Sequence, residues 1–293
     1  MKQDRQVLAL GFFDGVHLGH RALLESCVEL ARSLKATPAA LTLDVHPLRL
    51  LQGEGPGLLC TLQERERLLR QGGMERVCIL PFDEKTMRMD WQDYFRMLVG
   101  EYGAVGIVCG DDHRFGYKGQ GTAALLEQAC LQAGIACRIV PQQALGEVRI
   151  SSSHIRQLLA QGQMEETARF LGRPYTLEGV VVHGKQLGRT LGTPTANLTL
   201  PRELAQPRLG VYAARVWVDG TAFASVTNIG TRPTVSGQGI TVESWLPDFQ
   251  GDLYGQVLRV ELRHFLRPEE KFPSLEALQK AIHADAQKVR QLL

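Results

Sequence analysis

Hydrophobic and polar positions in the first half of the chain switch repeatedly between short apolar runs and longer segments with helical periodicity. Apolar runs separated by helical segments predict parallel strands joined by crossover helices, with helices on both faces of the sheet. Ligands of such sheets bind beside the carboxyl ends of the strands. We expect strands at residues 7–10, 39–43, 76–80, 104–109 and 136–140, and helices at 21–33, 62–70, 90–100 and 122–133.

The pattern changes near the middle of the chain. Helical periodicity over residues 153–159 and 164–171 stops at Gly172-Arg173-Pro174. Proline cannot continue a helix, and it moves the preceding residue out of the helical region. A chain of 293 residues is long enough for two domains. We therefore predict one domain over residues 1–173 and a second over residues 174–293.

The second half is rich in short strand-like segments and glycine-containing turns. Asp219-Gly220 is a two-residue hairpin signal between two of these segments. Such strands favour a closed, mainly antiparallel barrel. Ser274 is a plausible cap for an amphipathic helix over residues 274–293. The expected strands cover residues 177–182, 210–218, 221–229, 239–246 and 256–265.

Composition narrows the classes of protein. The net charge is only +2 and neither half has the basic excess of a nucleic-acid binder. No apolar run reaches the ~20 residues of a membrane span, and the polar N-terminus does not resemble a signal peptide. Six cysteines without a Cys-x-x-Cys pattern are typical of reduced, buried thiols. We expect a cytoplasmic protein, a monomer or weak homo-oligomer, with small-molecule substrates.

A first candidate site lies between the first strand and the first helix. His17 and His20 are three residues apart at a helix N-terminus, where free N–H groups and the helix dipole favour anions. Transfer of a nucleotidyl group depends on positioning and charge stabilisation of this kind. The candidate phosphate-binding residues of this segment are Gly11, Phe13, Asp14, Gly15 and Gly19.

Two later segments extend this site. The loop 110–116 follows a buried strand and presents Asp112, Arg114 and Phe115, an acid, a base and an aromatic. In the segment 150–156, the hydroxyls of Ser151 and Ser152 enter a helix and can bind phosphate. Arg156 would lie one turn into that helix, where it can neutralise a triphosphate.

A second candidate site belongs to the other half of the chain. The stretch 184–197 is glycine-rich, and backbone N–H groups in such loops surround phosphates. Thr195 and Asn197 supply hard oxygen ligands suited to Mg²⁺ bridging the phosphates of ATP. The candidate phosphate-binding residues here are Gly184, Gly188, Arg189 and Gly192.

These motifs together resemble the bacterial bifunctional riboflavin kinase/FMN adenylyltransferase (FAD synthetase) family. Residues 13–20 resemble its Phe-Asp-Gly-Val-His-x-Gly-His signature, and residues 188–197 its Gly-Arg-x-x-Gly-x-Pro-Thr-Ala-Asn signature. The resemblance implies a Rossmann-like nucleotidyltransferase domain followed by a β-barrel riboflavin kinase domain. It implies phosphorylation of riboflavin to FMN by ATP, and then adenylylation of FMN to FAD with release of pyrophosphate.

The resemblance also implies roles for single residues. His17, His20 and Arg156 would be catalytic in adenylylation, and Glu243 would be the base that accepts the ribityl hydroxyl proton. Arg267 either reaches the flavin or pairs with acidic residues. The flavin-binding candidates are Asp112, Arg114, Phe115, Asn228, Arg232 and Arg267.

Five positions depart from the family pattern, and other functions stay open. A flavin or nucleotide sensor, an enzyme with one live activity, and a different adenylyltransferase or relative of class I tRNA synthetases are the alternatives. Intact His17, His20, Thr195, Asn197 and Glu243 disfavour the sensor. The departures are Phe12, His113, Gly119, Thr193 and Trp245.

Overall fold

The computed structural model describes residues 5–53, 55–184, 192–234 and 237–293, with the side chains of 232–239 outside the description. The chain forms two compact units, Met1–Ser152 and Ser153–Leu293. Helix α8 (Met164–Leu171) packs within the second unit, against its barrel. The sequence pattern places this helix in the first domain, and the boundary expected after Arg173 stays a prediction.

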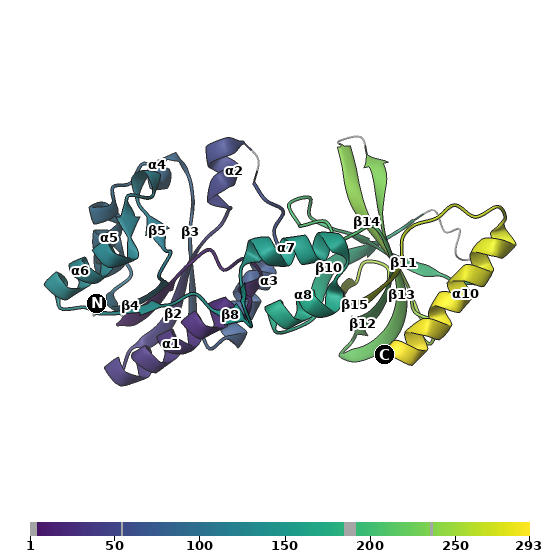
Figure 1. Ribbon diagram of the computed structural model, residues 1–293, viewed down its shortest axis with the longest axis horizontal. Helices are drawn as coiled ribbons and strands as arrows, with labels where there is room; N and C mark the ends of the chain where they lie inside the picture. Colours follow the sequence, from purple (N-terminus) through teal and green to yellow (C-terminus); the bar gives the residue numbers. More distant parts are fainter. Residues whose placement is uncertain (1–4, 54, 185–191, 235–236) are drawn as a thin grey trace. The chain divides into compact units, whose positions relative to one another are not determined.

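The first unit is built on a parallel five-stranded sheet, as the sequence predicts (Figure 1). Its strand order is β3-β2-β1-β4-β7, so β1 is central and pairs with both β2 and β4. Strands β2 and β3 extend the sheet on one side of β1, and β4 and β7 then extend it on the other side. The strands are β1 (Gln6–Leu10), β2 (Thr37–Leu43), β3 (Arg76–Leu80), β4 (Ala104–Gly110) and β7 (Ala136–Val140).

Helices cover both faces of this sheet because successive strand residues point to opposite sides. Val7 and Ala9 of β1 pack in the core beneath one pair of helices, whereas Leu8 and Leu10 pack beneath the other pair. The first pair is α1 (Leu18–Leu34) and α3 (Leu62–Gln71), and the second is α5 (Trp91–Gly100) and α6 (Ala123–Ala133).

Several short elements of this unit were not predicted. Each has too few residues for a hydrophobic period to be recognised in the sequence. They surround the carboxyl ends of the strands, where the candidate site was expected. These elements are the helices α2 (Pro47–Gln52) and α4 (Glu84–Met87), the turns η1 (Asp14–Val16) and η2 (Tyr117–Gly119), and the two-residue ladders β5 (Arg114–Phe115) with β6 (Gly121–Thr122) and β8 (Ala144–Leu145) with β9 (Val148–Arg149).

The second unit is a closed antiparallel barrel with the order β10-β11-β14-β13-β12-β15. The predicted barrel is confirmed, but β11 (Thr195–Thr199) was expected to belong to the glycine-rich loop. Its preceding glycines and proline concealed a strand of five residues. The other strands are β10 (Tyr175–Val182), β12 (Gly210–Val218), β13 (Thr221–Thr234), β14 (Gly237–Trp245) and β15 (Val257–Arg267), and the helix α7 (Ser152–Gln161) precedes α8.

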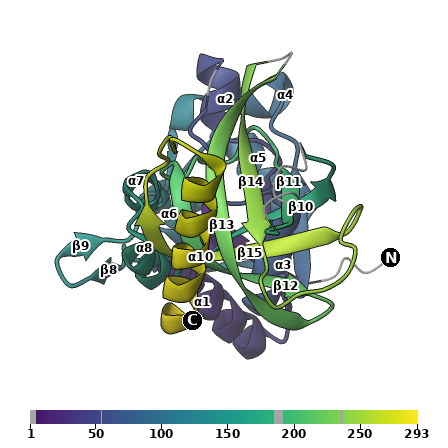
Figure 2. The same cartoon turned by 90° about the vertical axis from the view of Figure 1, so that its right-hand side faces the viewer.

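A terminal helix, α10 (Leu275–Leu292), lies against strands β12 and β13 of the barrel (Figure 2). Ser274 caps it, since its hydroxyl accepts a hydrogen bond from the Ala277 N–H. Ala286 and Val289 of this helix share a core with Val211 and Val226. The helix therefore encloses one side of the barrel.

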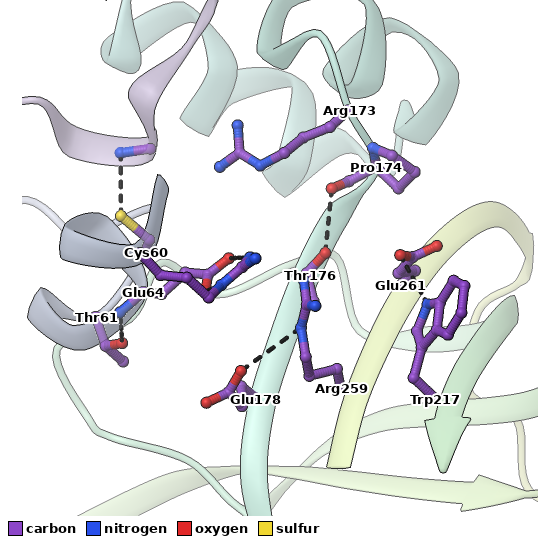
Figure 3. A network of polar contacts seen from close by, with 12 residues as sticks. Cys60, Thr61, Glu64, Arg173, Pro174, Thr176, Glu178, Trp217, Arg259 and Glu261 are labelled. Carbon is purple, nitrogen blue, oxygen red and sulfur yellow. Dashed lines mark hydrogen bonds and ion pairs between the residues drawn. The ribbon is translucent and has the colours of Figure 1, made fainter. Parts of the chain in front are cut away.

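Polar side chains pair along neighbouring barrel strands (Figure 3). The Trp217 indole N–H donates to Glu261 over 2.8 Å, and Arg259 and Glu178 form an ion pair of 3.6 Å.

All six cysteines are free thiols. None of the described helices combines the length and hydrophobicity of a membrane span.

The two faces of α6 provide a matched test of this packing. Leu126 is fully buried under the sheet, whereas Leu131, on the same helix, is 82% exposed. We expect Leu126→Ala to reduce the free energy of unfolding by about 2–5 kcal/mol through lost burial and a cavity. Leu131→Ala should change it by less than about 0.5 kcal/mol. Urea unfolding followed by circular dichroism measures both, and equal effects would contradict this packing.

Candidate active sites

The first unit has a cleft of about 350 Å³ at the carboxyl ends of β1, β4 and β7. This is the point at which the strand order of the sheet reverses, between β1 and β4. Open α/β sheets bind their ligands at such a point. The cleft brings together nine of the residues singled out from the sequence, namely Gly11, Phe13, His17, Gly19, His20, Asp112, Arg114, Ser151 and Ser152.

The two histidines are held as a stacked pair. His17 caps α1, and its Nδ1 accepts a hydrogen bond from the backbone N–H of His20 over 3.3 Å. Their ring centroids are 3.6 Å apart. A side chain at Gly19 would come within 3.3 Å of the His17 ring, so the glycine leaves room for it. Because Nδ1 accepts in the cap, Nε2 is the ring nitrogen left to donate.

Two of the predicted phosphate-binding residues, Asp14 and Gly15, do not line this cleft. The Asp14 carboxylate accepts a hydrogen bond from the backbone N–H of Leu59 over 2.8 Å. The backbone N–H of Gly15 donates to the Cys60 thiol over 3.2 Å. Both residues therefore anchor their loop to the segment before α3. Their predicted contact with phosphate stays a prediction.

An apolar cavity of about 890 Å³ adjoins the cleft. The two spaces share part of their lining, Gly11, Phe12, His113 and Arg114. Phe115, which was predicted to bind flavin, lines only the apolar cavity. The other apolar side chains around it include Leu41, Leu43, Leu80, Phe82 and Tyr94.

His113 stands at the junction of these two spaces. Its ring stacks on Phe115 with centroids 5.6 Å apart. Burial lowers the pKa of His113 to about 4, so the imidazole is neutral at physiological pH. Nearby, Asp112 and Arg149 form an ion pair of 2.6 Å. The departure at His113 therefore keeps an uncharged aromatic ring in the loop 110–116.

In the second unit, strand register aligns three polar residues. Glu243 on β14 is paired with Asn197 on β11 and with Asn228 on β13. Directly paired residues point to the same face of a sheet. Thr195 and Trp245 form the adjacent pair on that same face, two residues along each strand.

Two cavities meet at this row. The larger has about 630 Å³ and is lined by Glu243, Asn228 and Trp245, with apolar residues of α10. The smaller has about 250 Å³ and is lined by Asn197 and Gly184. Thr195 lines both cavities. The candidate base and the candidate metal ligands thus lie where a mainly apolar space meets one of mixed polarity.

Asn197 has the geometry of a cation ligand. Its amide nitrogen donates to the carbonyl and hydroxyl oxygens of Thr195, both over 3.3 Å. Its Oδ1 is buried without a hydrogen-bond partner among the described residues. A buried oxygen of this kind requires a partner, and a hard cation is one. The residues present therefore fit Mg²⁺.

The structure describes the contacts of some of the remaining candidate site residues in the second unit, whereas others lie outside the described residues. Arg267 lines the larger cavity and also forms an ion pair of 2.9 Å with buried Asp285. Asn228 donates to Glu269 over 3.0 Å. Gly192 lies in an exposed turn, and the Arg156 guanidinium donates to Ser153 over 3.2 Å on α7. Gly188, Arg189 and the side chain of Arg232 lie outside the described residues.

Two family models match the chain, and each covers the part that holds one of the two candidate sites. The model described as FAD synthetase matches residues 1–154, and the model described as riboflavin kinase matches residues 171–293. A bifunctional riboflavin kinase/FMN adenylyltransferase of Escherichia coli strain K12 is 38% identical over 286 residues, 97% of this chain and 91% of that protein. The chain belongs to this bifunctional family.

Other relatives agree in length and fold. A Pseudomonas fluorescens protein of the same description is 36% identical over 288 residues, covering 98% of this chain and 92% of its own. A crystal structure from Streptococcus pneumoniae, titled as a macrolide-efflux protein, superposes with a TM-score of 0.90. It is 30% identical and covers 99% of this chain and 95% of its own. The resemblance predicted from the motifs is confirmed, and with it an enzyme of two activities, riboflavin kinase and FMN adenylyltransferase.

The close approach of Gly184 to Asn197 gives a test of the second site. A Cβ at Gly184 would lie 2.5 Å from Asn197 Oδ1. Gly184→Ala should displace that oxygen and lower riboflavin kinase kcat/KM by about 10-fold or more, while FMN adenylylation is retained. The control is Gly100→Ala, where a Cβ meets nothing within 4 Å. Kinase activity equal in both variants would contradict a role for the Asn197 oxygen.

Proposed function

We propose that the second unit phosphorylates riboflavin and the first unit adenylylates the resulting FMN. One observation carries this division. Each unit has a cleft of mixed polarity beside a more apolar cavity; His17 and His20 line the cleft of the first unit, and Glu243 lines the cavity of the second. A reaction between an aromatic ring system bearing a polar chain and a nucleoside triphosphate needs both kinds of space.

In the kinase step, the flavin ring occupies the larger cavity, against Trp245 and α10. The Glu243 carboxylate accepts the proton of the ribityl 5′-hydroxyl, and that oxygen attacks the γ-phosphorus of ATP while ADP leaves. Thr195 and Asn197 would hold Mg²⁺, which supplies positive charge to the phosphates. The shared position of Thr195 in both cavities supports this arrangement.

In the adenylylation step, an FMN phosphate oxygen attacks the α-phosphorus of ATP and pyrophosphate leaves. His17, His20 and the N–H groups at the start of α1 stabilise the charge that develops on the transferred phosphate. Ser151 and Ser152, which line the same cleft, bind phosphate there. The flavin ring occupies the apolar cavity beside Phe115, with Arg114 between the two spaces.

Further residue roles, the domain bounds and the location belong to the same proposal. Gly188 and Arg189 surround the ATP phosphates in the kinase site, and Arg232 and Arg267 bind flavin there. Arg156 neutralises the triphosphate in adenylylation. We also propose residues 1–173 and 174–293 as the functional domains. Free cysteines support a cytoplasmic location, and we propose a monomer or weak homo-oligomer without a nucleic-acid partner.

Separate active sites predict separable losses. Glu243→Ala should reduce FMN formation from riboflavin by at least about 100-fold, because the base is lost, and leave FAD formation from FMN unchanged. His17→Ala combined with His20→Ala should stop FAD formation while FMN still accumulates. Both reactions are measured by chromatography of flavins with ATP and Mg²⁺.

Each variant is the control for the other, since both retain one activity of the folded chain. Loss of both activities in the Glu243 variant, with an unchanged free energy of unfolding, would contradict the assignment of one reaction to each unit.

A further inference from the structure

Arg65 is an arginine of the first unit whose role the sequence did not indicate. It lies on α3, outside the motifs, yet its side chain is fully buried. Lysine and arginine are almost never fully buried unless their charge is compensated. Burial lowers the pKa of Arg65, with Asp14 and Asp44 among the groups that counter the shift. Arginine stays protonated in proteins, so a positive charge is held inside this unit.

The contacts of Arg65 converge on the loop after β1. Its Nη1 donates to the Phe12 carbonyl over 3.1 Å and to the Leu43 carbonyl over 2.8 Å. The same nitrogen lies 3.2 Å from the Thr42 hydroxyl, which itself donates to the Phe12 carbonyl over 2.9 Å. One guanidinium therefore joins the end of β2 to the start of the loop that follows β1.

The guanidinium also fixes the side chain of Phe12. It lies over the Phe12 ring, 4.1 Å from the ring centroid, in a cation–π contact. The His46 ring contacts the same phenyl ring edge-on, with centroids 4.8 Å apart. Phe12 lines both the cleft and the apolar cavity. Its position therefore affects the boundary between the two spaces.

The loop that Arg65 fixes is under backbone strain. Phe13 adopts φ +56° and Val16 adopts φ +39°, values that residues with side chains rarely take. Such conformations persist when surrounding contacts determine them. The next residue, His17, caps α1 and stacks on His20. A displacement of the loop backbone would therefore also displace His17 and His20.

We propose that Arg65 is a positioning residue for FMN adenylylation, acting through Phe12 and the strained loop to align His17 and His20. It lines neither the cleft beside the histidines nor the apolar cavity that adjoins it. The role rests on the proposed assignment of adenylylation to this unit. A lysine would keep the charge, but its ammonium is not planar and cannot lie flat on the phenyl ring as the guanidinium does.

The test compares three variants of the full chain. Arg65→Met keeps the length of the side chain and removes the charge, Arg65→Lys keeps the charge, and Arg70→Met is the control. Arg70 is on the same helix, with half of its side chain exposed and paired to Glu66. Steady-state kinetics give kcat and KM for FMN adenylylation, and riboflavin phosphorylation is measured in the same preparations.

We expect Arg65→Met to lower the kcat of adenylylation by about 100-fold, with a smaller change in KM, because the reacting groups are misaligned. Arg65→Lys should recover part of that loss. Riboflavin phosphorylation should stay within about 2-fold in every variant, and Arg70→Met should match the unaltered chain. Normal adenylylation in Arg65→Met would overturn the proposal, as would equal loss of both activities.

A double-mutant cycle keeps the test decisive if Arg65→Met folds poorly. Arg65→Lys, Phe12→Leu and their combination should show non-additive effects on kcat, since the arginine acts through the ring. Additive effects would overturn the proposal. Failure of the underlying function is distinguishable, because the unaltered chain would then form no FAD from FMN at all.

Discussion

Strand register is the constraint on which both candidate sites depend. In the barrel, the pairing of β11, β14 and β13 puts Asn197, Glu243 and Asn228 in one row. A slip of one residue would turn each side chain to the opposite face. In the first unit, parallel pairing of β1 with β4 brings the two loops that follow these strands to one edge of the sheet. Backbone hydrogen bonds thus determine which polar groups meet.

The two units reach a similar arrangement from different architectures. In each, an apolar cavity of several hundred Å³ adjoins a smaller cleft of mixed polarity. The parallel sheet forms its cleft from strand ends and a helix N-terminus, whereas the barrel uses side chains within strands. Two different chemistries follow, because a helix N-terminus stabilises anionic charge while a carboxylate on a strand can accept a proton.

Sequence predicted more of the fold than of the site. The five parallel strands of the first unit and the barrel were predicted because their periodicity extends over several residues, but β11 was concealed by the glycines and proline before it. The motifs indicated His17, His20 and Glu243. Arg65 gave no signal, because a buried arginine and an exposed one look alike in a helical sequence.

The central claim is that one chain carries two successive flavin reactions in two separate sites. A chromatographic time course of the purified chain with riboflavin, ATP and Mg²⁺ tests it most directly. The account predicts that FMN appears first and then declines as FAD accumulates. FMN that persists without any FAD would contradict an active adenylylation site in the first unit. Tight flavin binding without any product would contradict both reactions.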